Sequence, residues 1–155
     1  MAEEQTDAAP ETETSIIGEL MAELDAFEPT DDSVDNEERL QIWVDRWEEA
    51  PDKELALPSI LGVFERYPDN SGLGEPGPLV HAVEQIPDYE QALSTSLETS
   101  PSYYGVWMVN RILGGDLPAD VRTAWLDVLR RIAQSETAPP SVAATAQEFL
   151  GFQEG

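Results

Sequence analysis

The sequence predicts an all-α protein of about eight short antiparallel helices, stacked as helical hairpins. Two observations support this fold class. Apolar residues recur three and four positions apart along nearly every segment after residue 13, which is the spacing of one helix face. No segment alternates apolar and polar residues in the strict manner of a half-buried strand. Prolines and glycines separate the periodic segments, so we expect short connections between neighbouring helices.

The first helix is expected to follow an acidic tail. Residues 1–13 are polar and carry no apolar period, which predicts a disordered tail because they bury too little surface to offset their ordering. The remaining chain is expected to form a single all-helical domain over residues 14–152. Ser15 is a suitable N-cap for the first helix. The apolar face of this helix consists of Ile16, Ile17, Leu20, Met21, Leu24 and Phe27.

Two further helices are predicted from stripes of apolar side chains. Asp35 and Glu38 stand three residues apart at the expected start of the second helix, as in a variant of the capping box. The third helix is expected to begin near Leu57, where the first turn tolerates Pro58, and to stop before Pro68. The apolar stripe of the second helix consists of Leu40, Trp43, Val44 and Trp47.

Proline and serine mark the starts of the remaining helices. Pro78 opens a helix after a loop that is dense in turn-forming residues. Asp88 is expected to cap the next helix, and Ser100 the one after it, because serine followed by proline is a strong helix start. The last two helices are expected to follow Pro118 and Pro140.

Negative charge dominates the composition. The chain of 155 residues has 32 acidic and 8 basic residues, for a net charge of −24, and 17 of the acidic residues lie within residues 1–50. Such a surface repels nucleic acids and anionic membranes and attracts basic partners. No apolar run approaches the roughly 18 residues that span a bilayer, and the N-terminus is acidic where a secretory signal would be basic. We therefore expect a cytoplasmic protein without membrane or direct nucleic-acid contacts.

The sequence offers little catalytic or metal-binding chemistry. His81 is the only histidine, cysteine is absent, and the position of His81 in a predicted helix indicates a core or boundary residue. The spacing that begins at Asp31 resembles a calcium loop, but Asn36 stands at the glycine position and Ile42 at the position of the bidentate glutamate. The glycines of residues 72–78 have no preceding strand and no lysine–serine pair. We expect a protein that is not an enzyme and binds neither a metal nor a cofactor.

The surface is the remaining candidate for function. Carboxylates crowd the second predicted helix and the loop before it, including two at the helix C-terminus, where negative charge is unfavourable. Such residues suit contacts with a basic partner, although a merely solvated face would look the same. An exposed tyrosine among acidic residues would serve as an anchor. The predicted partner-binding residues are Asp31, Asp32, Asp35, Glu37, Glu38, Asp45, Glu48, Glu49 and Tyr103.

Three phrases stand out in the central part of the chain, residues 55–135. The phrase around Glu65–Gly74 (ERYPDNSGLG) precedes a helix, a Pro-x-Tyr turn follows at Pro87–Tyr89, and an Asn-Arg-Ile-Leu helix follows at Asn110–Leu113. In these phrases the chain resembles the small helical immunity proteins of bacterial polymorphic toxin systems. The resemblance implies a HEAT-like stack of helical hairpins. It also implies that these phrases have structural roles, among them a buried polar pair at Asn110 and its neighbour Arg111.

The same resemblance implies a function. An immunity protein binds a cognate toxin domain and occludes its active site. Many such toxins are basic nucleases, and carboxylates can fill a site that otherwise grips phosphate. Two alternatives stay open: an acidic helical-repeat adaptor that joins other proteins, and a nucleic-acid mimic that sequesters a DNA-binding protein.

Overall fold

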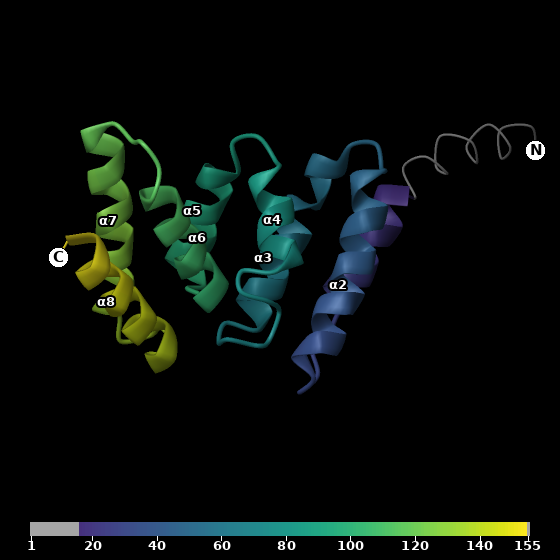
Figure 1. Cartoon of the computed structure of the whole chain (residues 1–155), viewed down its shortest axis with the longest axis horizontal. Helices are drawn as coiled ribbons and strands as arrows, with labels where there is room; N and C mark the ends of the chain where they lie inside the picture. Colours follow the sequence, from purple (N-terminus) through teal and green to yellow (C-terminus); the bar gives the residue numbers. More distant parts are fainter. Residues whose placement is uncertain (1–15, 155) are drawn as a thin grey trace, which may run out of the picture. The chain divides into compact units, whose positions relative to one another are not determined.

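The computed structural model describes residues 16–154, which form helices joined by turns and loops with no strand among them (Figure 1). The predicted all-α class is therefore confirmed for this part of the chain. The predicted tail at residues 1–13 and the predicted cap Ser15 lie outside the described residues. No helix between residues 16 and 154 has the length and hydropathy that crossing a membrane requires.

The described chain divides into two compact units, residues 16–63 with 72–87 and residues 64–71 with 88–154. Each unit has its own set of buried apolar side chains. The sequence predicts a single domain over residues 14–152 and antiparallel packing of its hairpins, and both stay predictions.

The first unit contains a helix over residues 16–25, followed by α2 (Ser33–Glu48) and a 3-10 helix, η1 (Lys53–Ala56). It also holds most of α3 (Leu57–Arg66), whose last turn belongs to the second unit, and α4 (Pro78–Glu84). As expected, Pro78 occupies the start of α4. Proline fits there because the first helical N–H has no partner within the helix.

Apolar stripes hold the first unit together. The predicted face of α2 is buried, and its two tryptophan rings stack with centroids 6.3 Å apart. Trp43 Nε1 donates to the Leu20 carbonyl oxygen at 2.8 Å, and Trp47 Nε1 donates to that of Lys53 at 2.7 Å. These bonds satisfy both indole N–H groups while the rings stay in the core. The buried side chains of α2 are Asn36, Leu40, Trp43, Val44 and Trp47.

The start of α2 differs from the prediction. Asp32, rather than Asp35, is the N-cap, and its Oδ1 accepts a hydrogen bond from the Asp35 backbone N–H at 3.2 Å. The helix therefore begins before the first residue of the predicted capping box. The apolar stripe of α2 begins only at Leu40, so the sequence pattern placed the start of the helix too late.

The second unit is built from four helices: α5 (Tyr89–Thr99), α6 (Tyr103–Leu113), α7 (Ala119–Ala133) and α8 (Pro140–Glu154). Helix α8 packs against both α6 and α7, and α5 packs against α6. An aromatic cluster contributes to this core. Its ring contacts join Phe64 to Tyr104, Tyr103 to Tyr104 and to Trp107, and Trp107 to Phe149.

The cap of α6 was predicted two residues too early. Ser102 is the N-cap, and its Oγ accepts a hydrogen bond from the Gly105 N–H at 3.0 Å. Ser100 instead terminates α5, where its backbone N–H donates to the Ser96 carbonyl oxygen at 2.7 Å. Asp88 occupies the N-cap position of α5 as predicted, but it has left-handed backbone geometry and its side chain makes no capping bond.

The polar pair implied by the immunity-protein resemblance is not buried. Arg111 is exposed and Asn110 is half-buried. The Asn110 Oδ1 accepts a hydrogen bond from Gln153 Nε2 of α8 at 2.8 Å. Asn110 thus links α6 to α8 at the rim of the core, where water can reach its remaining polar atoms.

Candidate protein-binding surface

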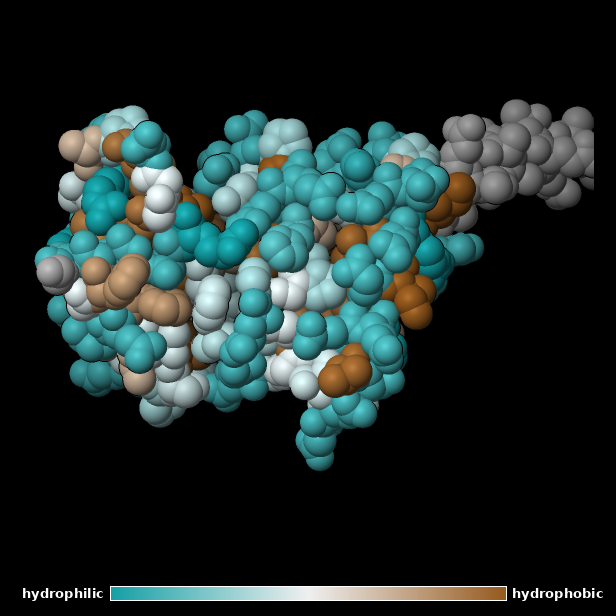
Figure 2. Space-filling view, in the orientation of Figure 1, coloured by the Kyte–Doolittle hydropathy of each residue, from teal (hydrophilic) through white to brown (hydrophobic). Residues whose placement is uncertain are grey.

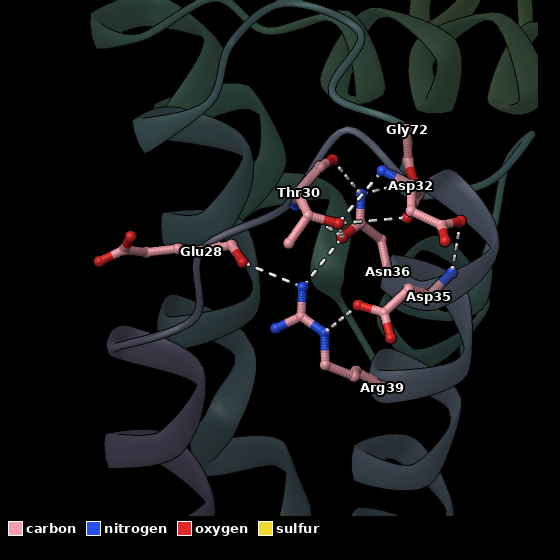
Figure 3. A network of polar contacts seen from close by, with 7 residues as sticks. All are labelled: Glu28, Thr30, Asp32, Asp35, Asn36, Arg39 and Gly72. Carbon is pink, nitrogen blue, oxygen red and sulfur yellow. Dashed lines mark hydrogen bonds and ion pairs between the residues drawn. The ribbon is translucent and has the colours of Figure 1, made fainter.

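The acidic helix α2 is anchored at its N-terminus by a network of polar contacts, which we call the Asn36 network (Figure 3). Asn36 is fully buried. Its Oδ1 accepts from the Thr30 backbone N–H at 2.8 Å, and its Nδ2 donates to the Thr30 carbonyl oxygen at 2.9 Å. The network consists of Glu28, Thr30, Asp32, Asp35, Asn36, Arg39 and Gly72.

Asn36 therefore fastens two loops to α2. Besides the Thr30 contacts, its Nδ2 donates to the carbonyl oxygen of Gly72 at 3.4 Å. The sequence indicated Asn36 only as a mismatch in a calcium loop. Its spacing from Leu40, Trp43 and Trp47 does place it in phase with the buried stripe. A polar side chain on a buried helix face needs internal hydrogen-bond partners, so this spacing could have identified Asn36 as the centre of a buried polar network.

Both arginines of α2 take part in the fold. Arg39 pairs with Asp35 at 3.0 Å, donates to Asn36 Oδ1 at 2.9 Å, and lies 4.6 Å from the centroid of the Phe27 ring. Arg46 donates two hydrogen bonds to the Glu23 carboxylate, at 2.7 and 2.9 Å. These bonds lower the pKa of Glu23 below its ordinary value, and the same pair raises the pKa of Arg46.

The opposite side of α2 carries exposed carboxylates, and we call Glu37, Glu38, Asp45, Glu48 and Glu49 the acidic side of α2. Two of these side chains bond to neutral amides, Asp45 to Gln41 Nε2 at 3.0 Å and Glu48 to Gln85 Nε2 at 3.1 Å. Among residues 16–154, the other three carboxylates make no hydrogen bond or ion pair. No arginine or lysine in this part of the chain neutralises the acidic side of α2.

Exposed aliphatic residues interrupt these acids. Val34 is 64% and Ile42 61% exposed. They alternate with acids at steps of four, four, three and four residues, a spacing that keeps one helix face in line. In the space-filling view, hydrophobic groups interrupt a mostly hydrophilic surface over this part of the molecule (Figure 2). This line of residues, which we call the α2 ridge, consists of Val34, Glu38, Ile42, Asp45 and Glu49.

An open groove of about 450 Å³ lies beside the ridge. Gly77 forms part of its wall and has a positive φ of +93°. A Cβ atom at this position would lie 2.0 Å from the Leu73 carbonyl oxygen, so a side chain would clash there. Three carboxylates face the groove without an arginine or lysine among its lining residues. The lining residues are Glu37, Glu38 and Gln41 of α2, then Glu75, Pro76, Gly77, Pro78 and His81.

His81 lies on the groove and not in the core or at its boundary, so that prediction is wrong. Its side chain is 59% exposed, with Nδ1 3.9 Å from Glu84 Oε1. In α4 the buried positions are those of Leu79, Val80, Ala82 and Val83, and this packing turns position 81 outward. Within residues 16–154 no three histidine or carboxylate groups are arranged to hold a metal ion.

The predicted binding residues have different structural roles. Asp32 caps α2 and Asp35 is half-buried in its ion pair, whereas Asp31 is exposed in the preceding loop. The other five acids form the acidic side of α2. Tyr103 belongs to the second unit and is half-buried in the aromatic cluster, so it does not point away into solvent as expected. Glu75 and His81, which line the groove, were not predicted as binding residues.

Comparison with known proteins found no matching family model, no matching curated protein and no matching solved structure. The surface itself is therefore the guide to function. What that surface offers is a line of carboxylates and aliphatic groups on a helix that is firmly held from its opposite side.

Proposed function

We propose that this protein is a binding protein of the immunity type, which blocks a cognate basic toxin domain with the acidic side of α2. The observation that carries the proposal is the uneven neutralisation of α2. Arg39 and Arg46 pair with carboxylates on one side of the helix, and the five exposed acids of the other side have no cationic partner among residues 16–154.

Electrostatics determines the kind of partner. Within residues 16–154, the first unit has 16 acidic residues against three arginines and lysines, and the second unit has 11 against five. Such a field speeds association with a positively charged protein and disfavours polyanions. A toxin site that binds phosphate would present the complementary charge, and carboxylates on a fixed helix would occupy it.

The adaptor alternative has one observation in its favour. Phe152 of α8 is 76% exposed and Val121 of α7 is 37% exposed, both in the second unit. Apolar groups on a second unit would suit a further protein contact. An adaptor should therefore retain a partner that is unaffected by changes to α2, whereas an inhibitor should not.

The test is capture of partners from host lysate on the immobilised full chain at low and moderate salt. We expect one dominant basic polypeptide, toxic when it is expressed without this protein and harmless when it is co-expressed. Several partners of ordinary charge and no toxicity would instead support the adaptor.

Two variants that remove the same number of charges test which surface binds the partner. Substituting four acids of α2, Glu37, Glu38, Glu48 and Glu49, with glutamine should weaken binding about 30-fold. This corresponds to roughly 0.5 kcal/mol for each exposed charge. The control substitutes four exposed acids of the second unit in the same way: Glu90, Glu98, Glu136 and Glu148. Equal losses from both variants would show that the acidity acts only through net charge.

A further inference from the structure

We propose that the α2 ridge docks one basic amphipathic helix of the partner. Val34 and Ile42 contact the apolar face of that helix, and Glu38, Asp45 and Glu49 pair with its lysines or arginines. The inference rests on the proposed function and extends it, because it specifies the structure of the partner segment and adds two residues that carry no charge.

The aliphatic residues of the ridge lie outside the buried core of the first unit. Val34 and Ile42 are the two most exposed large apolar side chains of the first unit, at 64% and 61%. Both are β-branched, which lowers helix propensity slightly, and their burial is too small to offset much of this cost. A single exposed aliphatic residue is ordinary on a protein surface. Two that alternate with unneutralised acids along one helix face have the composition of a small interface, with apolar anchors among polar groups.

The geometry favours a helix over an extended segment. Residues 33–48 of α2 use their backbone groups within the helix, so α2 has no free edge to which a strand could add. Contacts must come from side chains alone. Positions 34 to 49 extend about 22 Å along the helix at a rise of about 1.5 Å per residue, which matches a partner helix of about 15 residues. Such a helix presents apolar and basic side chains at three- and four-residue spacing, as the ridge does.

Charge selects the partner's sequence. The ridge itself contributes three carboxylates, and Glu37 and Glu48 flank it on α2. The carboxylates of Glu38 and Glu49 make no hydrogen bond or ion pair with any other residue among 16–154. An acidic or neutral amphipathic helix would leave these groups without compensation, so lysine and arginine must border the apolar stripe of the partner.

Binding of synthetic peptides to the full-length protein tests the inference. One peptide has about 16 leucine and lysine residues arranged as an amphipathic helix, and the other is an isomer of the same composition without an apolar face. Titrations followed by backbone amide resonances at moderate salt should show at least tenfold tighter binding of the amphipathic peptide, with shifts concentrated in α2. Equal affinities, absence of binding, or shifts confined to other elements would overturn the inference.

Two variants separate the apolar and charged contributions. The double substitution V34Q and I42Q should abolish the preference between the peptides and leave the weak, salt-sensitive binding that both share. Because both side chains are exposed, the circular dichroism and midpoint of unfolding should stay near those of the parent. The matched control is V121Q on α7, which should keep the full preference.

The outcome can be distinguished from that of the proposed function. If a basic toxin is captured and its affinity is unchanged by V34Q and I42Q, docking on the α2 ridge is wrong but the inhibitor function stands. If the amphipathic peptide is clearly preferred but the host contains no toxic partner, docking on the α2 ridge stands and the inhibitor function is wrong.

Discussion

The two sides of α2 differ in how their polar side chains are used: one side bonds to neighbouring parts of the fold, and the other is the side that we propose for recognition. On the side of the Asn36 network, Asn36 and Arg39 bond to loop backbone, and nearby Arg46 pairs with Glu23. On the α2 ridge, Glu38 and Glu49 are exposed, and no arginine or lysine of the described chain pairs with them. Composition alone does not separate these sides, because both carry acids. The position of the two arginines separates them, because it determines which acids are neutralised within residues 16–154.

The largest effect should come from the network side, through Asn36→Ala. This substitution leaves the backbone N–H and carbonyl oxygen of Thr30 without their partners in two part-buried contacts. An unsatisfied group costs about 1–3 kcal/mol, and the lower end applies here because Thr30 itself is exposed, so the free energy of unfolding should fall by about 2 kcal/mol. Urea denaturation followed by tryptophan fluorescence measures this change, because Trp43 and Trp47 lie on the same helix.

Asn110→Ala provides the control for that experiment. Asn110 is half-buried, with Gln153 Nε2 as its donor, so its loss should cost about 1 kcal/mol. If Asn36→Ala cost no more than Asn110→Ala, the Asn36 network would not be what fixes α2.

A smaller effect is expected from Glu23→Gln, which removes the paired carboxylate opposite Arg46. The pair is bidentate but half-exposed, so the loss should be about 1 kcal/mol at neutral pH, the upper end for an exposed pair. The pKa of Glu23 is lowered in the folded protein. Its contribution is therefore complete above the carboxyl's unfolded pKa, about 4.3, and disappears as the pH falls through the lower folded pKa.

Denaturation curves of the parent and Glu23→Gln proteins between pH 3 and pH 7 check the sign. The two stabilities should converge toward acid pH and separate toward neutrality. A constant difference across this range would mean that the substitution acts through packing rather than through charge. High salt should shrink the difference at neutral pH, because exposed pairs are screened.

The sequence predicted the buried side of α2 better than its surface. The stripe of Leu40, Trp43, Val44 and Trp47 is buried as predicted, because apolar period alone determines which face turns inward. Caps were less predictable. Asp32 and Asp35 are both good N-caps, and only the contacts of the preceding loop select Asp32.

The groove could not be predicted, because it joins parts of the chain that are far apart in sequence. Glu37 and Glu38 meet Glu75 and His81 there only through the packing of α2 against α4. The predicted acids of α2 were identified from charge density, which does not reveal their neutralisation. Asp35 and Glu38 look equivalent in the sequence, yet Asp35 has an arginine partner and Glu38 has none within the part of the chain that the structure describes.

The smallest effect, and the one of opposite sign, is expected from Glu49→Gln on the α2 ridge. Glu49 is the C-cap of α2 and follows Asp45 by four residues. A negative charge there opposes the helix dipole and repels the nearby carboxylate, so its removal should raise the free energy of unfolding by about 0.5 kcal/mol. Thermal unfolding at low salt measures the gain, and Asp35→Asn at the other end of α2 should instead lower stability. A protein that becomes more stable but binds its partner less tightly would show that Glu49 is held for recognition. A loss of stability in Glu49→Gln would mean that this carboxylate stabilises the fold, and Glu49 would then no longer count among the acids proposed for recognition.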